Sequence, residues 1–315
     1  MSVAMHEGEI PVDADLVQSM VADQFPAYAG LPISAVRSTG TVNAIFRLGE
    51  RHYARLPRKS DWSDDLDREA HWLPRLAPHL SLRVPTPIAV GRPTAAYPQR
   101  WAIYEWIDGR PYDDERVGDE EEAAETLATF LTELRCIDTA GAPRAGRRPL
   151  PELDDVTREA IAASSGVIDA DAALQVWERE LETPLWSGPP VWIHTDLLRP
   201  NLLVDDGRIT AVIDFGGAGV GDPAADVIAA WAVFGAAGRA RFRAVLDIDD
   251  HTWSRARGWA LHQAAMIIPY YATTNPGFVT LAQRTVEEIL ADSSTGAGQR
   301  TSLGGRSCNG HGTHT

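Results

Sequence analysis

The stretch from His194 to Gly216 constrains the fold of this chain more than any other part of the sequence. It reads HTDLLRPNLLVDDGRITAVIDFG: a polar segment, an apolar run, the turn sequence DDGR, and a second apolar run that ends at Asp214. A turn of this composition between two short apolar runs predicts an antiparallel hairpin. Strands joined by a tight turn lie side by side, so Asn201 and Asp214 should come close together.

The same stretch carries the groups that phosphoryl transfer needs. A kinase uses one carboxylate to accept or orient the attacking hydroxyl, and two oxygen-bearing side chains to hold Mg²⁺ across the nucleotide phosphates. The pattern H-x-D-x4-N, followed by D-F-G, supplies these groups. Asp196 is the candidate catalytic base, and Asn201 and Asp214 are the candidate Mg²⁺ ligands. We interpret His194 as a support for the loop rather than as a base.

Length and charge limit the class of protein. At 315 residues and 44% hydrophobic content, the chain can form one large domain or two lobes around a real core. The formal net charge of -15 argues against sequence-independent binding to nucleic acid, which depends on Lys and Arg. We interpret the acidic surface as serving solubility, although it is compatible with a cationic substrate.

Cysteine usage and hydropathy predict a cytoplasmic protein. Cys136 and Cys308 are far apart in the chain, which argues against a disulfide framework. Residues 1–30 lack a basic segment followed by an apolar core, and no run of about 18 apolar residues occurs. We therefore expect no membrane partner, and we leave open whether the protein is a monomer or a homodimer.

Residues 1–107 predict a compact α+β lobe with an antiparallel sheet. Pro74 and Pro78 should bend or end its second helix, for which Asp61 is the expected N-cap. The expected elements are a helix over 11–25, three short strands within 35–56, a helix over 61–80, and strands around 88–91 and 101–107.

Residues 108–292 predict a mainly helical second lobe around the hairpin. The acidic run at 119–122 suits the positive end of a helix dipole. From Ser293 to Thr315 the Gly, Ser and Thr content predicts a disordered tail. The expected helices are 119–137, 152–164, 169–183, 224–234, 237–246, 252–271 and 279–292.

Residues 192–225, WIHTDLLRPNLLVDDGRITAVIDFGGAGVGDPAA, closely resemble the catalytic region of the aminoglycoside phosphotransferase family. The usual signature there is H-G-D-x-x-x-x-N, an apolar hairpin, I-D-F or I-D-W, and G-D-P-x-x-D, which ends here at Asp226. In order and type of element, the resemblance covers about residues 35–290. It implies a protein-kinase-like fold of two lobes and a small-molecule kinase that uses ATP or GTP with Mg²⁺.

The resemblance also assigns residues to the nucleotide site. It places Thr41 and Asn43 in a hairpin turn over the phosphates. Glu69 corresponds to the helix glutamate that pairs with a basic residue on the third strand. In the linker between the lobes, backbone groups of Glu105 and Ile107 would bind the purine edge.

The basic residue of the third strand is Arg55, where many relatives have a phosphate-binding lysine, and the only lysine of the chain is Lys59. An arginine can neutralise phosphate, but its planar head binds differently from an ammonium group. Either Arg55 takes over the role, or nucleotide binding is altered. Thr195 replaces the usual glycine of the signature, which adds a side chain beside Asp196.

Two acidic residues after the hairpin are interpreted as structural. Asp222 precedes a proline and Asp226 lies on the helix that follows. In this pattern such residues brace the catalytic loop through hydrogen bonds. We favour this role over direct catalysis for both.

The expected function is transfer of the γ-phosphate to a hydroxyl of a small molecule. The resemblance suggests an antibiotic of the aminoglycoside, macrolide, peptide or nucleoside type, with resistance as the result, and a primary metabolite such as an amino alcohol stays open. The alternative is a kinase-like module that binds nucleotide with weak or no catalysis, motivated by Arg55 and Thr195. A protein kinase is disfavoured because no A-P-E segment follows Phe215 and Gly216.

Overall fold

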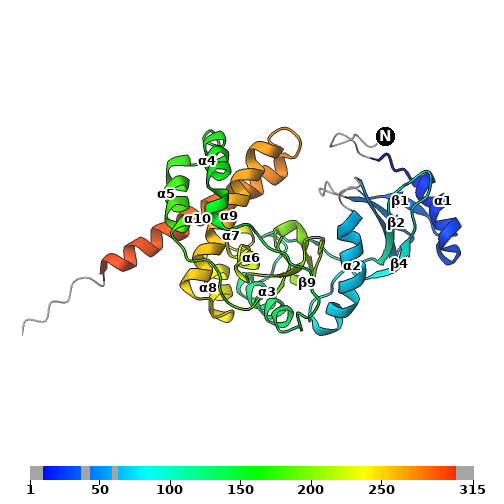
Figure 1. Ribbon diagram of the computed structural model, residues 1–315, viewed down its shortest axis with the longest axis horizontal. Helices are drawn as coiled ribbons and strands as arrows, with labels where there is room; N and C mark the ends of the chain where they lie inside the picture. Colours follow the sequence, from blue (N-terminus) through cyan, green and yellow to red (C-terminus); the bar gives the residue numbers. More distant parts are fainter. Residues whose placement is uncertain (1–9, 37–42, 59–62, 303–315) are drawn as a thin grey trace, which may run out of the picture.

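The computed structural model describes residues 10–36, 43–58 and 63–302. Figure 1 shows a sheet-containing part at one end of the molecule and a mostly helical part at the other, with α2 (Ser63–Leu76) on the side of the sheet that faces the helices. The α+β class, with an antiparallel sheet followed by a mainly helical region, is thus confirmed.

The N-terminal part is built on a five-stranded antiparallel sheet. The strand alternation gives it two apolar faces: Trp101 and Ile103 point into the core under α1, whereas Ala102 and Tyr104 pack against Leu66 of α2. Helices therefore cover both faces of the sheet. In spatial order the strands are β1 (Ile33–Ala35), β2 (Asn43–Leu48), β3 (His52–Pro57), β5 (Trp101–Glu105) and β4 (Pro87–Gly91), and α1 spans Ala14–Gln24.

Helix α2 connects the two parts. Leu66 packs on the sheet, while Leu73 and Leu76 belong to the large core of the helical part. Pro74 lies inside the last turn, and a short 3-10 segment, Ala77–His79, follows directly, as the prolines predict. The expected N-cap, Asp61, lies outside the described residues. The large core of the helical part therefore includes residues of α2.

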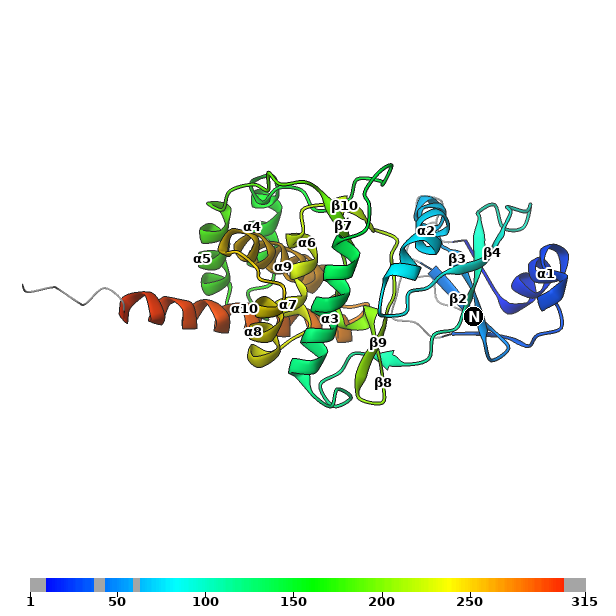
Figure 2. The same ribbon diagram turned by 90° about the horizontal axis from the view of Figure 1, so that it is seen from below.

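The predicted hairpin is present. Strands β8 (Leu202–Asp205) and β9 (Arg208–Val212) pair antiparallel around a turn in which Asp206 and Gly207 both have positive φ, at 46° and 78°. Two short strands were not predicted: β6 (Arg110–Pro111) pairs with β8, and β10 (Gly219–Gly221) pairs with β7 (Val191–Ile193). Figure 2 shows the hairpin between α3 and the sheet-containing part.

The helical part is organised around α9, whose faces pack on several other helices. Its N-cap Asp249 accepts the backbone N–H of Thr252, and Trp253, Trp259 and Leu261 are buried along its length. The helices are α3 (Glu120–Arg135), α4 (Asp154–Ala163), α5 (Ala170–Leu181), α6 (Ala224–Val227), α7 (Ala229–Ala232), α8 (Ala236–Val245), α9 (Asp250–Tyr271) and α10 (Pro276–Ser302).

Two predicted boundaries differ from the structure. The helix expected over 224–234 is divided into α6 and α7 at Ile228. The tail expected from Ser293 is helical as far as Ser302, and the rest of it lies outside the described residues; Ser293 is buried, and the Ser294 hydroxyl donates to Leu290 O at 2.9 Å. Small polar residues extend a helix that is already formed more readily than they start one.

Backbone and side-chain contacts fix the sheet-containing part against the hairpin. Arg83 N donates to Thr210 O at 3.1 Å, and Val212 N donates to Arg83 O at 3.0 Å. From α2, the Arg68 guanidinium donates to Gly216 O at 2.6 Å. The chain after β9 is therefore tied directly to α2.

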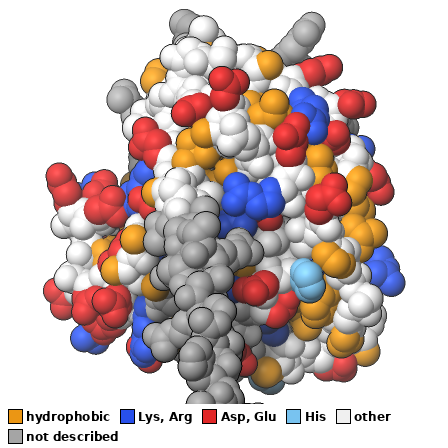
Figure 3. All heavy atoms as spheres, turned by 90° about the vertical axis from the view of Figure 1, so that its left-hand side faces the viewer, with side chains coloured by type: hydrophobic (Ala, Val, Ile, Leu, Met, Phe, Trp, Pro, Cys, Tyr) orange, Lys and Arg blue, Asp and Glu red, His pale blue; other side chains and the backbone are white. Residues whose placement is uncertain are grey.

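The surface combines acidic side chains with arginine. Figure 3 shows acidic groups over much of the visible end of the helical part, with arginine beside several of them. Arg158 pairs with Glu178, and Arg241 pairs with Glu125, in ion pairs between exposed side chains. Within the described residues, no helix has the length and apolar character needed to cross a membrane.

We predict that Glu120→Ala destabilises the protein by about 1 to 2 kcal/mol. Helix α8 has no side-chain cap of its own, and the Glu120 carboxylate accepts the N–H groups of Gly235 at 2.6 Å and Gly238 at 3.1 Å. Chemical denaturation measures the loss. The neighbouring exposed Glu121→Ala is the control and should change the free energy of unfolding by less than about 0.5 kcal/mol. Equal effects of the two substitutions would contradict the capping role.

Candidate functional site

The backbone of the loop after β7 is held by one buried carboxylate. Asp226, from α6, accepts the N–H of His194 at 3.0 and 2.9 Å and the N–H of Thr195 at 2.7 Å, and it is fully buried. Thr195 has φ 77°, a left-handed conformation that a β-branched residue adopts only under constraint. The glycine usual at this position would have no such strain. The hydrogen bonds of Asp226 therefore hold a bend that the local sequence disfavours.

His194 links this loop to the end of β9. Its Nε2 lies 3.0 Å from Ile213 O and must donate to it, while Nδ1 accepts the backbone N–H of Asp196 at 3.2 Å. The ring is buried and packs edge-on against Phe215, with centroids 4.5 Å apart. Both ring nitrogens are thus used within the protein, which is the arrangement expected of a supporting residue.

Asp196 and Asn201 form a direct side-chain contact. Asn201 Nδ2 donates to Asp196 O at 2.9 Å and to Asp196 Oδ2 at 3.0 Å, which leaves the amide oxygen of Asn201 as a ligand atom. Ile213 N donates to Asn201 O at 2.9 Å, so the next residue, Asp214, begins beside Asn201. The hairpin brings the three motif residues into one place, as the sequence predicted.

Asp214 presents its carboxylate to the space between the two parts of the molecule. Its φ is 68°, its side chain is 52% exposed, and its Oδ1 lies 4.0 Å from Arg55 Nη2. The described residues contain no group of three His, Cys, Asp or Glu side chains that could hold a metal by themselves. One carboxylate and one amide oxygen, completed by phosphate oxygens and water, suit Mg²⁺ bound together with a nucleotide.

The pKa of the Asp196 carboxyl is raised above its usual value. Burial is the main cause, because it disfavours the charged form, and the nearby Asp214 carboxylate adds to it. His194, Arg147 and the hydrogen bond from Gln263 act in the opposite direction. Asp196 is therefore a more basic carboxylate than an exposed aspartate.

Arg147 and Gln263 also contact the loop, and neither residue was predicted from the sequence. Gln263 Nε2, from α9, donates to Asp196 Oδ1 at 2.9 Å. Arg147 Nη2 donates to Thr195 O and to Gln263 Oε1, both at 2.9 Å. These residues lie far from the motif in the chain, and no local pattern marks them.

Arg199 is a further anchor that the sequence reading did not identify. It lies between Asp196 and Asn201 and binds Asp114 with both terminal nitrogens, at 3.0 and 2.6 Å. Its Nε also donates to Val233 O at 3.0 Å. The loop is therefore held to the segment that follows β6 and to the residue that follows α7.

Arg55 joins three elements. Its Nη1 donates to Glu69 Oε2 at 2.5 Å, in a pair that is almost fully buried, and the Tyr104 hydroxyl donates to the same oxygen at 3.1 Å. With its amide oriented to suit these donors, Asn43 Oδ1 accepts from Arg55 Nε at 2.9 Å and Nη2 at 3.1 Å. The pairing of Glu69 with the third strand is thus present, and Asn43 contacts the guanidinium.

The other nucleotide-site residues are placed less directly. Thr41 lies outside the described residues. Glu105 ends β5 opposite His52 of β3, and Ile107 is buried against Leu203. Both stand in the connection between the sheet and the helical part, and the backbone contacts expected of them remain a prediction.

Asp222 stabilises the turn after β10. Its carboxylate accepts from Arg255 Nε at 2.7 Å and Nη2 at 3.2 Å, and from the N–H of Ala224 at 2.9 Å. These bonds connect α6 to α9. Asp226 makes hydrogen bonds to the loop of the kind expected from the sequence, whereas the bonds of Asp222 hold the turn after β10 to α9.

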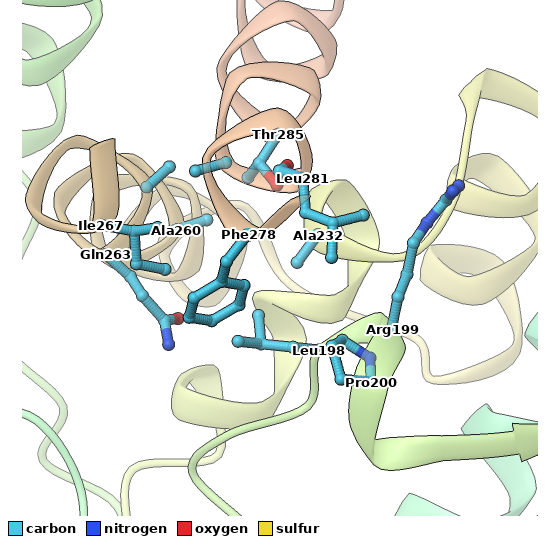
Figure 4. Close-up of a pocket in the computed structure, with 12 residues that line it drawn as sticks. Leu198, Arg199, Pro200, Ala232, Ala260, Gln263, Ile267, Phe278, Leu281 and Thr285 are labelled. Atoms are coloured by element: carbon cyan, nitrogen blue, oxygen red, sulfur yellow. Dashed lines mark hydrogen bonds between the residues drawn. The ribbon is translucent and has the colours of Figure 1, made fainter. Parts of the chain in front are cut away.

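An apolar pocket lies next to this loop. Figure 4 shows the Phe278 ring between Gln263 and Leu198, with α9 and α10 forming the walls. Ala260, Ala264, Ile267 and Ala282 line it as well. Gln263 therefore borders both the pocket and Asp196.

Comparison with known protein sequences identifies one family. The family described as "APH: Phosphotransferase enzyme family" matches residues 35–259 of the chain. The protein YcbJ of Bacillus subtilis (strain 168), itself described as uncharacterized, is 28% identical over 226 residues, which make up 66% of this chain and 70% of that protein.

Comparison with solved structures identifies the fold. The GDP complex of wild-type aminoglycoside 2'-phosphotransferase-IIIa is 16% identical, with a TM-score of 0.66 over 90% of this chain and 100% of that one. The macrolide 2'-phosphotransferase MphH from Brachybacterium faecium is 22% identical, with a TM-score of 0.56 over 87% and 98%. Such likenesses show the fold alone, and the predicted kinase-like fold is confirmed.

We predict that Asp226→Asn destabilises the protein by about 2 to 3 kcal/mol. The asparagine oxygen could still accept from the N–H groups of His194 and Thr195, but without the negative charge that strengthens these bonds, and its amide nitrogen would face the N–H of His194 where Oδ2 now accepts it. Thermal and denaturant unfolding measure this loss. The exposed Asp23→Asn on α1 is the matched control and should lie within about 0.5 kcal/mol of the unmodified protein. A shift of that small size for Asp226→Asn would show that the carboxylate does not hold the loop.

Proposed function

The chain belongs to the APH phosphotransferase enzyme family, and from this premise we propose that it transfers the γ-phosphate of ATP or GTP to a hydroxyl group of a small molecule. Mg²⁺ is the proposed metal and the nucleotide is the co-substrate. The proposal rests above all on one observation: Asp196, Asn201 and Asp214 share one site.

The proposed roles follow from the geometry. Asp196 accepts or orients the proton of the attacking hydroxyl, since its Oδ atoms are held by neutral amides and retain lone pairs for a further donor. Asn201 Oδ1 and the Asp214 carboxylate hold the metal. When bound, Mg²⁺ would neutralise part of the negative charge on the phosphates, and the loop would hold Asp196 and Asn201 in position.

Arg55 is proposed to take the place of the usual lysine. Glu69 and Asn43 fix its guanidinium, and Nη2 faces the side of Asp214. A planar cation that is held at three nitrogens can face phosphate oxygens with little further loss of side-chain entropy. This supports a working nucleotide site rather than a damaged one.

The acceptor is proposed to be an antibiotic. The neighbours of known structure include a GDP and kanamycin complex of an aminoglycoside phosphotransferase and macrolide 2'-phosphotransferases. Primary metabolites with a hydroxyl group form the second class of candidates.

We expect Asp196→Ala to reduce phosphate transfer by about 100-fold or more, because it removes the group that receives the proton. Transfer from γ-labelled ATP and GTP is measured over a panel of aminoglycosides, macrolides, peptide and nucleoside antibiotics and amino alcohols. Asp206→Ala, in the hairpin turn, is the control and should retain activity. Undiminished transfer by Asp196→Ala would remove the role that we propose for this residue.

The alternative function gives a different result in the same experiments. A kinase-like binding module would be stabilised against heat by Mg²⁺ with nucleotide, yet would transfer no phosphate to any acceptor or to water. The intact Asp196, Asn201 and Asp214 favour the enzyme.

We also expect Arg55→Lys to raise the KM for nucleotide by about 10-fold, with a smaller change in kcat. The ammonium group cannot reach Glu69 and Asn43 together as the guanidinium does. Initial rates at varied nucleotide concentration separate the two constants. An unchanged or lower KM would indicate that the arginine fork is not required for nucleotide binding.

A further inference from the structure

Two hydrogen bonds from different parts of the chain hold the two carboxylate oxygens of Asp196. Asn201 Nδ2, from the loop itself, donates to Oδ2 at 3.0 Å. Gln263 Nε2, from the middle of α9, donates to Oδ1 at 2.9 Å. With both bonds in place, the plane of the carboxylate is fixed; with only the Asn201 bond, it can turn about its terminal torsion.

Arg147 determines which way the Gln263 amide points. An amide can present either its oxygen or its nitrogen to a neighbour, and only the nitrogen is a donor. Arg147 has donors alone, and its Nη2 binds Gln263 Oε1 at 2.9 Å. The oxygen is thereby occupied, and the nitrogen is left facing Asp196. The same Nη2 donates to Thr195 O at 2.9 Å, so this orientation is tied to the loop.

We propose that Arg147 and Gln263 act as positioning residues that set the Asp196 carboxylate in its reactive orientation. This inference rests on the proposed function, because it presumes that Asp196 faces the attacking hydroxyl. Neither residue is assigned the task of transferring a proton. Both act on the carboxylate, Gln263 directly and Arg147 through the amide of Gln263.

The surroundings of Gln263 suit this task. Helix α9 packs against α10, α4, α5 and α6, so the residue stands on a rigid element rather than on a loop. Gln263 also lines the apolar pocket with Leu198 and Phe278 (Figure 4).

The test compares two substitutions at the same position. Gln263→Met keeps the length of the side chain and removes the donor. Gln263→Glu keeps the length of the side chain and an oxygen that can accept from Arg147. Its other oxygen cannot donate to Asp196 when the carboxylate is ionised. We expect kcat to fall about 10-fold for Gln263→Met and about 100-fold for Gln263→Glu, with the KM for nucleotide unchanged.

A merely structural role predicts the opposite order. Gln263→Glu would preserve the contact with Arg147 and would be the milder change, both in stability and in rate. The melting temperature is therefore measured beside kcat, and we expect Gln263→Glu to melt no lower than Gln263→Met. Gln283→Met on α10 is the matched control, since that glutamine is also half-buried and makes only a 3.5 Å contact to Val167 O.

A double-mutant cycle tests the part played by Arg147. If Arg147 acts on Asp196 by orienting the amide, Arg147→Met should lower kcat by a smaller factor when Gln263→Met is present than when it is absent. Multiplicative effects on kcat would show that Arg147 acts separately, which would overturn its role in the proposal. Crystal structures of the single variants give a second measurement, in which the Asp196 carboxylate should be turned from its present plane.

The rates can be measured before the acceptor is identified. Hydrolysis of Mg-ATP or Mg-GTP, in which water receives the γ-phosphate, is the first assay, and any acceptor found in the panel is the second. If the unmodified protein transfers phosphate and Gln263→Met is equally fast, or if Gln263→Glu is the milder change, the inference is wrong and the proposed function stands. If the unmodified protein transfers no phosphate to water or to any acceptor, the proposed function falls and the inference falls with it.

Discussion

The site depends on the hydrogen bonds that the buried carboxylate of Asp226 accepts from the loop. It accepts the backbone N–H groups of His194 and Thr195, and so holds a left-handed bend at a β-branched residue. Without these bonds the bend would relax toward an extended backbone, and Asp196 would leave the position at which Asn201 meets it. A fully buried residue thus helps to decide the position of Asp196.

Arginine carries most of the cationic contacts in and around the site. Arg55 spans strand β3, helix α2 and the side of Asp214, whereas Arg199 and Arg147 hold the loop from its two sides. Arg55 and Arg199 each use several nitrogens at once, which a lysine cannot do, whereas Arg147 makes both of its bonds through Nη2. Lys59 is the only lysine in the sequence, and the cationic contacts described at the site are made by arginine guanidinium groups.

The local part of the site could be predicted because its geometry depends on short-range rules. The turn DDGR predicts a hairpin, and the two strands of a hairpin end close to each other. Asn201 and Asp214, which flank the two strands, are therefore expected to lie close together. The α+β class followed from the alternation and helical periods in the same way. The composition of residues 293–302 did not predict the extension of α10 to Ser302, because small polar residues become helical there only as the continuation of a helix that is already formed.

The sequence by itself determined the H-x-D-x4-N and D-F-G motif, its hairpin, the α+β class and the family, because each of these is encoded in neighbouring residues. Only the tertiary structure decided which distant side chains meet the motif. Arg147 lies in an irregular segment and Gln263 on a long buried helix, and no spacing relates them to Asp196. Their meeting depends on how α9 packs beside the loop, which is a property of the whole core and of no local pattern.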